Sequence, residues 1–272
     1  MNHLFDALAQ KFDTISLQDL NEQAALLDRE ENKYVLTLER FFELGPELID
    51  NFHILKIGDD RVFEYRTLYF DTDDLIGYTY HHQNRIKRRF KIRTRHYVNS
   101  GLCFFEVKLK SKRGGTIKKR IDYAIENFNT VTDEARHFLN TTYQQVYGLP
   151  FTQIITPKLE VNCSRITLVH NESSERLTID FNLRFALNEN TSPPKSLVIM
   201  ETKSLSGRGV SDTIFKLHGI RSRSCSKYCL GVNLLHTEVK YNRFKPLLKL
   251  YKDLPFYDST NVAKECHSVN VR

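Results

Sequence analysis

Alternation of apolar and polar residues over eight separate runs is the feature of this sequence that most constrains its fold. A period of two places successive side chains on opposite faces of a strand, whereas a helix requires a period of 3.6. Eight strands are enough to close an antiparallel barrel. We therefore predict an α+β fold, a closed eight-stranded antiparallel β-barrel with peripheral helices. The predicted strands are Glu31–Leu38, Phe63–Phe70, Arg89–Tyr97, Leu102–Lys110, Thr116–Ile125, Leu159–Val169, Arg176–Phe185 and Leu197–Lys203.

Helical spacing occurs around and between these runs. Residues 1–27 predict one or two helices, because apolar residues recur there at intervals of three or four, and we expect these helices to pack outside the main body. The segment 239–272 begins with a helical pattern and ends in a polar tail. No linker divides the chain, so we expect one domain over residues 1–272. Other predicted helical segments are 41–51, with a break at Gly45-Pro46, 132–147 and 211–218.

Positive charge is clustered along the chain. The formal net charge is +7, from 40 Lys and Arg against 33 Asp and Glu. Seven of the eleven residues from Arg85 to Arg95 are Lys or Arg, as are seven of the thirteen from Lys108 to Arg120. A positive field attracts nucleic acid, anionic lipid or phosphorylated small molecules, so the placement of the charges has to distinguish among these partners.

Cysteine usage and the lack of a long apolar run indicate the compartment. The five cysteines form no CxxC pair, and the first residues lack the order of a signal peptide. No run approaches the roughly 20 apolar residues that cross a bilayer. We therefore expect a cytoplasmic protein with no transmembrane segment.

Long cationic side chains share one face of several predicted strands. Lys91, Arg93 and Arg95 point one way, and the apolar residues between them point the other. A solvated sheet face would explain any single strand of this kind. Five such strands would place like charges side by side, which costs a few tenths to about 1 kcal/mol per pair. We therefore predict a concave surface that binds a chain of phosphates, with the remaining polar positions at Glu31, Lys33, Glu106, Lys108, Lys118, Arg120, Arg176, Asp180, Glu201 and Lys203.

The order of these residues resembles the VTC-type polyphosphate polymerase domain of the triphosphate tunnel metalloenzyme (CYTH-like) superfamily. Arg29-x-Glu31-x-Lys33-Tyr34 is similar to the first-strand signature ExExK, with Arg29 at the first acidic position. The resemblance extends from about Asp28 to Leu235. It includes Tyr69-Phe70-Asp71-Thr72, Tyr80-His81-His82, Lys91-x-Arg93-x-Arg95-x-Tyr97, Phe105-Glu106-Val107-Lys108, Lys118-x-Arg120, Arg165, Glu201-x-Lys203 and Ser226-Lys227-Tyr228.

This resemblance implies a tunnel in which basic side chains bind ATP and inorganic phosphate or polyphosphate. It implies transfer of the γ-phosphoryl group of ATP to the growing chain, with Mn²⁺ or Mg²⁺ as cofactor. Together with the strand-face pattern it suggests three sets of site residues. The catalytic set is Arg93, Arg95, Lys108, Arg165 and Arg176; the substrate-binding set is Lys33, Lys91, Lys118, Arg120, Lys203, Ser226 and Lys227; and the metal ligands are Glu201, Glu31 and Glu106.

Two other functions stay open at this point. A tripolyphosphatase or nucleoside triphosphatase would use the same tunnel with water as the acceptor, although Arg29 agrees better with the polymerase branch than with branches richer in carboxylates. Cys163 stands where the family has a tyrosine, which removes a phenol that could contact phosphate. A non-catalytic polyphosphate-binding module is the other alternative. Nucleic acid is not expected as a partner, because Phe90 and Phe105 lie opposite the cationic face instead of among the cations.

Overall fold

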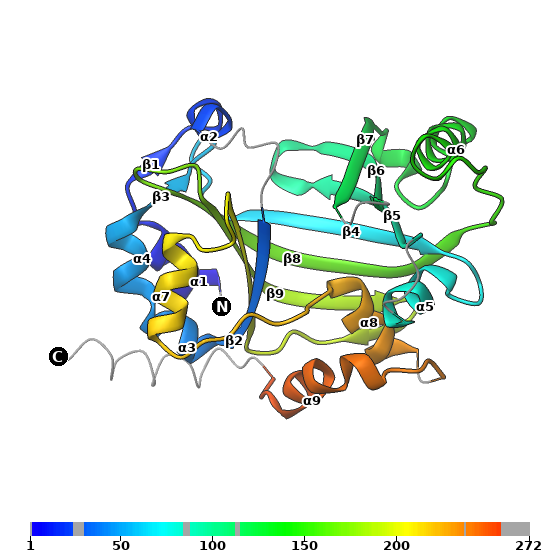
Figure 1. The fold of residues 1–272 in the computed structure, drawn as a ribbon. Coiled ribbons are helices and arrows are strands. Elements are labelled where there is room, and N and C mark those ends of the chain that lie inside the picture. The colour runs from blue at the N-terminus through cyan, green and yellow to red at the C-terminus, as the bar shows by residue number, and fades with distance from the viewer. Residues whose placement is uncertain (1, 24–29, 84–87, 112–114, 237, 257–272) are drawn as a thin grey trace.

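The computed structural model describes residues 2–23, 30–83, 88–111, 115–236 and 238–256 (Figure 1). These residues form an 11-stranded sheet, in which eight strands follow the antiparallel order β2-β11-β9-β8-β4-β5-β6-β7. Three short strands, β1 (Thr14–Ile15), β3 (Phe52–Leu55) and β10 (Asn190–Ser192), extend it. The strands of the main path are β2 (Glu30–Thr37), β4 (Phe63–Asp71), β5 (Phe90–Tyr97), β6 (Leu102–Lys110), β7 (Thr116–Asp122), β8 (Thr156–His170), β9 (Arg176–Leu187) and β11 (Leu197–Ser204).

The closure of the predicted barrel is wrong, although its eight strands are the eight of the main path. The path ends at β2 and β7, and no strand pairing joins these two within the described part of the chain. Alternation of residues determines which positions are strands and which face each side chain takes. It does not determine whether the first and last strands meet. Here β7 offers little apolar area to a further strand, since all of its residues are exposed or half-buried.

Helices cover the outer face of the sheet in two places (Figure 1). One group packs on β2, β8, β9 and β11 and consists of α1 (Asn2–Ala9), α3 (Leu38–Glu43), α4 (Gly45–Asn51) and α7 (Val210–Leu217). On β4, β5 and β6 lies α6 (Asp133–Tyr147), where the Thr132 hydroxyl accepts from the Ala135 N–H to begin the helix. Among the described helices, none is both long and apolar enough to cross a membrane.

The N-terminal helices belong to the body of the molecule, so the prediction that they pack outside it is wrong. Phe5 of α1 is fully buried and stacks on Phe181 of β9 with ring centres 3.5 Å apart. The next helix, α2 (Leu17–Gln23), buries Leu20 in a small cluster with Leu55 and Phe63. The Gln23 side-chain amide also donates to the carbonyls of His170 and Ser173, at 2.8 and 2.9 Å, which fixes α2 to the turn between β8 and β9.

Two helices that the sequence pattern did not indicate, α5 (Ile76–Gln83) and α8 (Lys227–Leu235), are joined by a buried carboxylate. Asp71 at the end of β4 is 1% exposed and accepts from the N–H groups of Gly77 and Tyr78, at 2.8 and 2.9 Å. The Tyr228 hydroxyl donates to the same carboxylate. This contact fixes the first turn of α8, which packs with α9 (Lys245–Asp253) against the sheet.

Close packing explains why α8 contains a glycine. A Cβ added at Gly231 would lie 2.6 Å from side-chain atoms of Leu159 and Phe185. Only glycine allows the helix to approach the sheet this closely. Glycine has a low helix propensity. The residue that allows α8 to pack closely on the sheet therefore also makes α8 hard to predict from the sequence.

Candidate functional site

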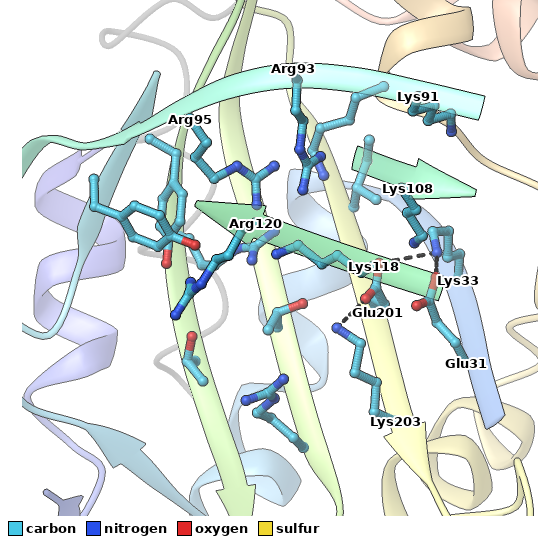
Figure 2. Close-up of a pocket in the computed structure, with 18 of the residues that line it drawn as sticks. Glu31, Lys33, Lys91, Arg93, Arg95, Lys108, Lys118, Arg120, Glu201 and Lys203 are labelled. Carbon is cyan, nitrogen blue, oxygen red and sulfur yellow. Dashed lines mark ion pairs between the residues drawn. The ribbon is translucent and has the colours of Figure 1, made fainter. Parts of the chain in front are cut away.

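The concave face of the sheet encloses a cavity of about 510 Å³. Side chains from every strand of the main path and from α8 line it, and Figure 2 shows those of β2, β5, β6, β7 and β11 pointing toward one another. Two carboxylates, Glu31 and Glu201, are among the lining residues. The eleven cationic lining residues are Lys33, Lys91, Arg93, Arg95, Lys108, Lys118, Arg120, Arg165, Arg176, Lys203 and Lys227.

Fourteen of the fifteen site residues predicted from the sequence lie at the wall of this cavity: the eleven cations, Glu31, Glu201 and Ser226. Glu106 is the exception. Strand register explains the convergence. Lys91 on β5 is directly opposite Lys108 on β6, and Lys108 is opposite Lys118 on β7. Like-charged cross-strand neighbours repel each other. An anion between these lysines would offset the repulsion. Arg29 of the first-strand signature lies outside the described residues.

Glu106 lies beneath the cavity as a counter-charge. Its side chain is 1% exposed, and its oxygens are 2.6 Å from an Arg93 guanidinium nitrogen and 2.5 Å from the Lys118 ammonium. Burial alone would raise the pKa of Glu106, but the charges of Arg93, Arg95 and Lys118 outweigh it and hold that pKa well below its usual range. Because Glu106 is buried and does not line the cavity, a metal ion in the cavity would not reach it, so we place Glu106 with the ion pairs and not with the metal ligands.

Asp180 on β9 holds a second pair of cations. It is 2% exposed and accepts two hydrogen bonds from the Arg165 guanidinium, at 2.5 and 2.8 Å, and one from Lys227. Burial would raise the pKa of Asp180, yet Arg165 and Lys227 lower it well below its usual range. The ionised carboxylate therefore sets the direction in which one cation from β8 and one from α8 enter the cavity.

Glu31 and Glu201 form the part of the site that fits a divalent metal. The Lys33 ammonium contacts Glu31 and lies 3.0 Å from Glu201, while Lys203 contacts Glu201 from the other side (Figure 2). The two carboxylates reach the cavity from adjacent strands and remain 30% and 20% exposed. Mg²⁺ and Mn²⁺ prefer such oxygen ligands, and Mg²⁺ commonly takes one or two carboxylates together with substrate phosphates.

This donor set is small. Within the described ranges, no three His, Cys, Asp or Glu side chains form a group that could hold a metal ion by themselves. A metal at Glu31 and Glu201 would therefore need phosphate oxygens or water as its remaining ligands, and the residues present fit a metal that binds together with a phosphate substrate.

Burial lowers the pKa of several lysines in the cavity wall. Burial lowers the pKa of Lys118 to about 8, since Arg93 and Arg95 offset the attraction of Glu106. Burial likewise lowers the pKa of Lys203 to about 8, and those of Lys91 and Lys108 are also depressed by burial. An anion in the cavity would reverse these shifts by stabilising the ammonium forms.

Aromatic and apolar side chains complete the wall, and most of them were not predicted. Tyr69 accepts a 3.2 Å hydrogen bond from Arg93, and the Arg165 guanidinium lies 4.8 Å from the centre of the Tyr65 ring. Tyr65, Thr67 and Tyr69 alternate in a predicted strand, and this alternation could have indicated that the two tyrosines share one face. Cys163, directly opposite Tyr65, is buried, and burial raises the pKa of its thiol to about 11.

The described geometry agrees with a comparison to protein families, in which the VTC domain model matches residues 28–236. Among solved structures, a candidate adenylate cyclase from Bacillus halodurans is 16% identical, with 80% of this chain and 97% of that chain covered and a TM-score of 0.48. A candidate adenylyl cyclase from Hippeastrum, described as having a dominant triphosphatase activity, is 14% identical, with 78% and 100% covered and a TM-score of 0.47. A search of curated proteins gave no match. The matched range contains every cationic residue of the cavity wall, and this chain belongs to the VTC domain family.

Proposed function

We propose that this protein is a metal-dependent phosphotransferase that moves the γ-phosphoryl group of ATP to phosphate or to the end of an inorganic polyphosphate chain. The observation that carries the proposal is the convergence of eleven cationic side chains on one cavity, which the four carboxylates of Glu31, Glu106, Asp180 and Glu201 only partly neutralise. A chain of phosphates supplies the missing negative charge along its whole length. Membership in the VTC domain family supports the same substrate class.

In this reaction the bond between the γ-phosphorus of ATP and the β–γ bridging oxygen breaks, and ADP leaves with that oxygen. A terminal oxygen of the acceptor phosphate forms the new bond to the γ-phosphorus. The transition state is loose and carries charge on the equatorial oxygens, so positioned cations can provide most of the stabilisation without a covalent nucleophile. Arg93, Arg95 and Arg165 suit this role because guanidinium binds phosphate oxygens in pairs, whereas the lysines act as point charges.

Glu31 and Glu201 are the residues that would hold Mn²⁺ or Mg²⁺. When bound, the ion supplies positive charge to the phosphate oxygens and helps orient them. Lys33, which contacts both carboxylates, would then be released toward the phosphates. The scarcity of carboxylates around the cavity favours a site that recruits its metal together with the nucleotide.

The test is to incubate the purified full chain with ATP and either Mn²⁺ or Mg²⁺. Polyphosphate is then stained on a gel while ADP and free phosphate are measured in the same samples. Polymer formed together with ADP supports the proposal. Release of free phosphate without polymer would identify a triphosphatase instead, and binding of polyphosphate without consumption of ATP would identify a binding module; either result contradicts the proposal.

We expect the affinity for inorganic tripolyphosphate to fall as the pH rises above about 8. The ammonium form of Lys118 attracts the anion, and this form predominates below its pKa of about 8 and is progressively lost as the pH rises through that value. Each lysine of this kind can lower the affinity by up to about tenfold per pH unit in that range. Isothermal titration calorimetry between pH 7 and pH 9.5 measures the effect.

A matched variant separates this effect from general alkaline changes. Lys118→Arg keeps a positive charge at the same position at every pH in this range, because guanidinium does not deprotonate there. We expect the affinity of this variant to depend less steeply on pH. An identical pH dependence in both proteins would exclude Lys118 as a source of it.

A further inference from the structure

The wall of the cavity changes character from one end to the other. Along β5 it runs from Lys91 through Arg93 and Arg95 to Tyr97, and Figure 2 shows the three cations in this order. Tyr97 is directly opposite Tyr65 on β4, with ring centres 4.9 Å apart. The lining is thus cationic over most of the strand and aromatic where the strand ends.

Apolar side chains from other elements meet at the aromatic end. Leu17 and Leu20 of α2 and Leu55 of β3 line the cavity with the two tyrosines. Leu20 and Leu55 are buried, whereas Leu17 is 45% exposed. Because Gln23 fixes α2 to the β8–β9 turn, this apolar wall is part of the ordered structure and is present before any ligand binds. Figure 1 shows α2 at one end of the long strands and α8 near the other.

A second cavity adjoins the site at the cationic end. It has a volume of about 360 Å³ and shares Glu31, Lys33 and Cys225 with the first. Its remaining wall comes from Asn32 and from Ser222, Arg223 and Ser224, a segment held along the edge of β2 by a 2.7 Å hydrogen bond from the Arg223 N–H to the Lys33 carbonyl. This wall is polar and positively charged, and it has no aromatic residue.

We infer that the site has a fixed direction: the nucleoside of ATP lies at the end formed by Tyr65, Tyr97 and Leu17, and the phosphate chain extends past Lys33 into the second cavity beside Arg223. This inference rests on the proposed function. A base offers flat apolar faces that stack on aromatic rings, whereas phosphates are drawn to cations. The reverse orientation would place the base against Lys91, Lys108 and Lys33 and remove water from charges that it cannot pair.

The experiment compares ATP with inorganic tripolyphosphate, which carries the phosphates without the nucleoside. Calorimetry is performed with the wild-type chain and with Tyr97→Ala, Tyr97→Phe and Leu17→Ala. We expect Tyr97→Ala to weaken ATP binding at least fivefold, with less than a twofold change for tripolyphosphate. Tyr97→Phe keeps the ring and should retain ATP affinity. Leu17→Ala removes a half-exposed side chain, so it leaves folding intact and should weaken ATP binding selectively.

The other end of the site is tested with long polyphosphate. We expect Arg223→Ala to weaken the binding of long chains about threefold, as for an exposed ionic contact, and to leave tripolyphosphate affinity unchanged. Equal losses for ATP and tripolyphosphate in Tyr97→Ala and Leu17→Ala, or no loss for either ligand, would overturn the direction alone. A wild-type chain that binds neither ATP nor tripolyphosphate would overturn the proposed function itself.

Discussion

Arg95→Ala is expected to lower kcat at least tenfold at saturating ATP and to leave the melting temperature unchanged or higher. Arg95 lines the cavity and forms no ion pair with any residue that the structure describes; it donates a 3.2 Å hydrogen bond to Thr67 and lies 5.5 Å from the Tyr65 ring centre. Its charge is therefore available for phosphate. A charge-assisted contact is typically worth about 1.5–3 kcal/mol, and its loss appears in kcat if the contact tightens in the transition state.

Two variants serve as controls for this result. Arg66 lies on the adjacent strand β4 but pairs with Glu160 and is not part of the cavity wall, so Arg66→Ala should keep full turnover. Arg93→Ala should lose both turnover and stability, because Arg93 pairs with the buried Glu106. Normal polymerisation by Arg95→Ala would remove Arg95 from the catalytic set. Both measurements need the same preparations, with kcat from initial rates and melting followed by fluorescence.

Asp180→Ala is expected to lower the free energy of unfolding by about 3–5 kcal/mol. The substitution removes the carboxylate that pairs with Arg165 and Lys227 and leaves two largely buried cations without it. Urea denaturation without ligand measures the loss. Tripolyphosphate should restore part of the stability, because it brings negative charge to the same two side chains and binds only the folded state.

The matched control for this prediction is a surface pair. Glu43→Ala removes the partner of Arg40, where both side chains are more than 40% exposed, and exposed pairs contribute about 0–1 kcal/mol. A loss below about 1 kcal/mol in Asp180→Ala, similar to that of Glu43→Ala, would contradict the assignment of Asp180 as the anchor of the two cations.

The faces of the strands were predictable, and so was the cationic wall. Lys91, Arg93 and Arg95 are two residues apart, and a period of two fixes their common direction whatever the rest of the fold does. Antiparallel pairing then brings Lys108 beside Lys91 and Lys118 beside Lys108. For these residues, the face of the strand on which the side chain lies is enough to predict that it lines the cavity.

The parts that could not be predicted depend on contacts between distant segments. Glu106 follows the same alternation as Lys108, yet it lies below the cavity because Arg93 and Lys118 draw its carboxylate between them. The place of α2 depends on Gln23 reaching the β8–β9 turn, some 150 residues later in the chain. β7 buries none of its residues, whereas β2 buries three, and this difference in burial accompanies the open edge of the sheet. None of these properties is visible in a periodic pattern.

The outer edge of β7, which pairs with no strand among the described residues, has a consequence for how the molecule behaves in a concentrated solution. A free strand edge can pair with the edge of another molecule and begin aggregation, and natural sheets prevent this with short strands and lysines. β7 has only seven residues, and Lys118, Lys119 and Arg120 occupy its centre. The positive charges of β7 therefore also protect this edge from self-association. A variant that neutralises them to weaken phosphate binding would lose solubility because its strand edge could pair with another molecule.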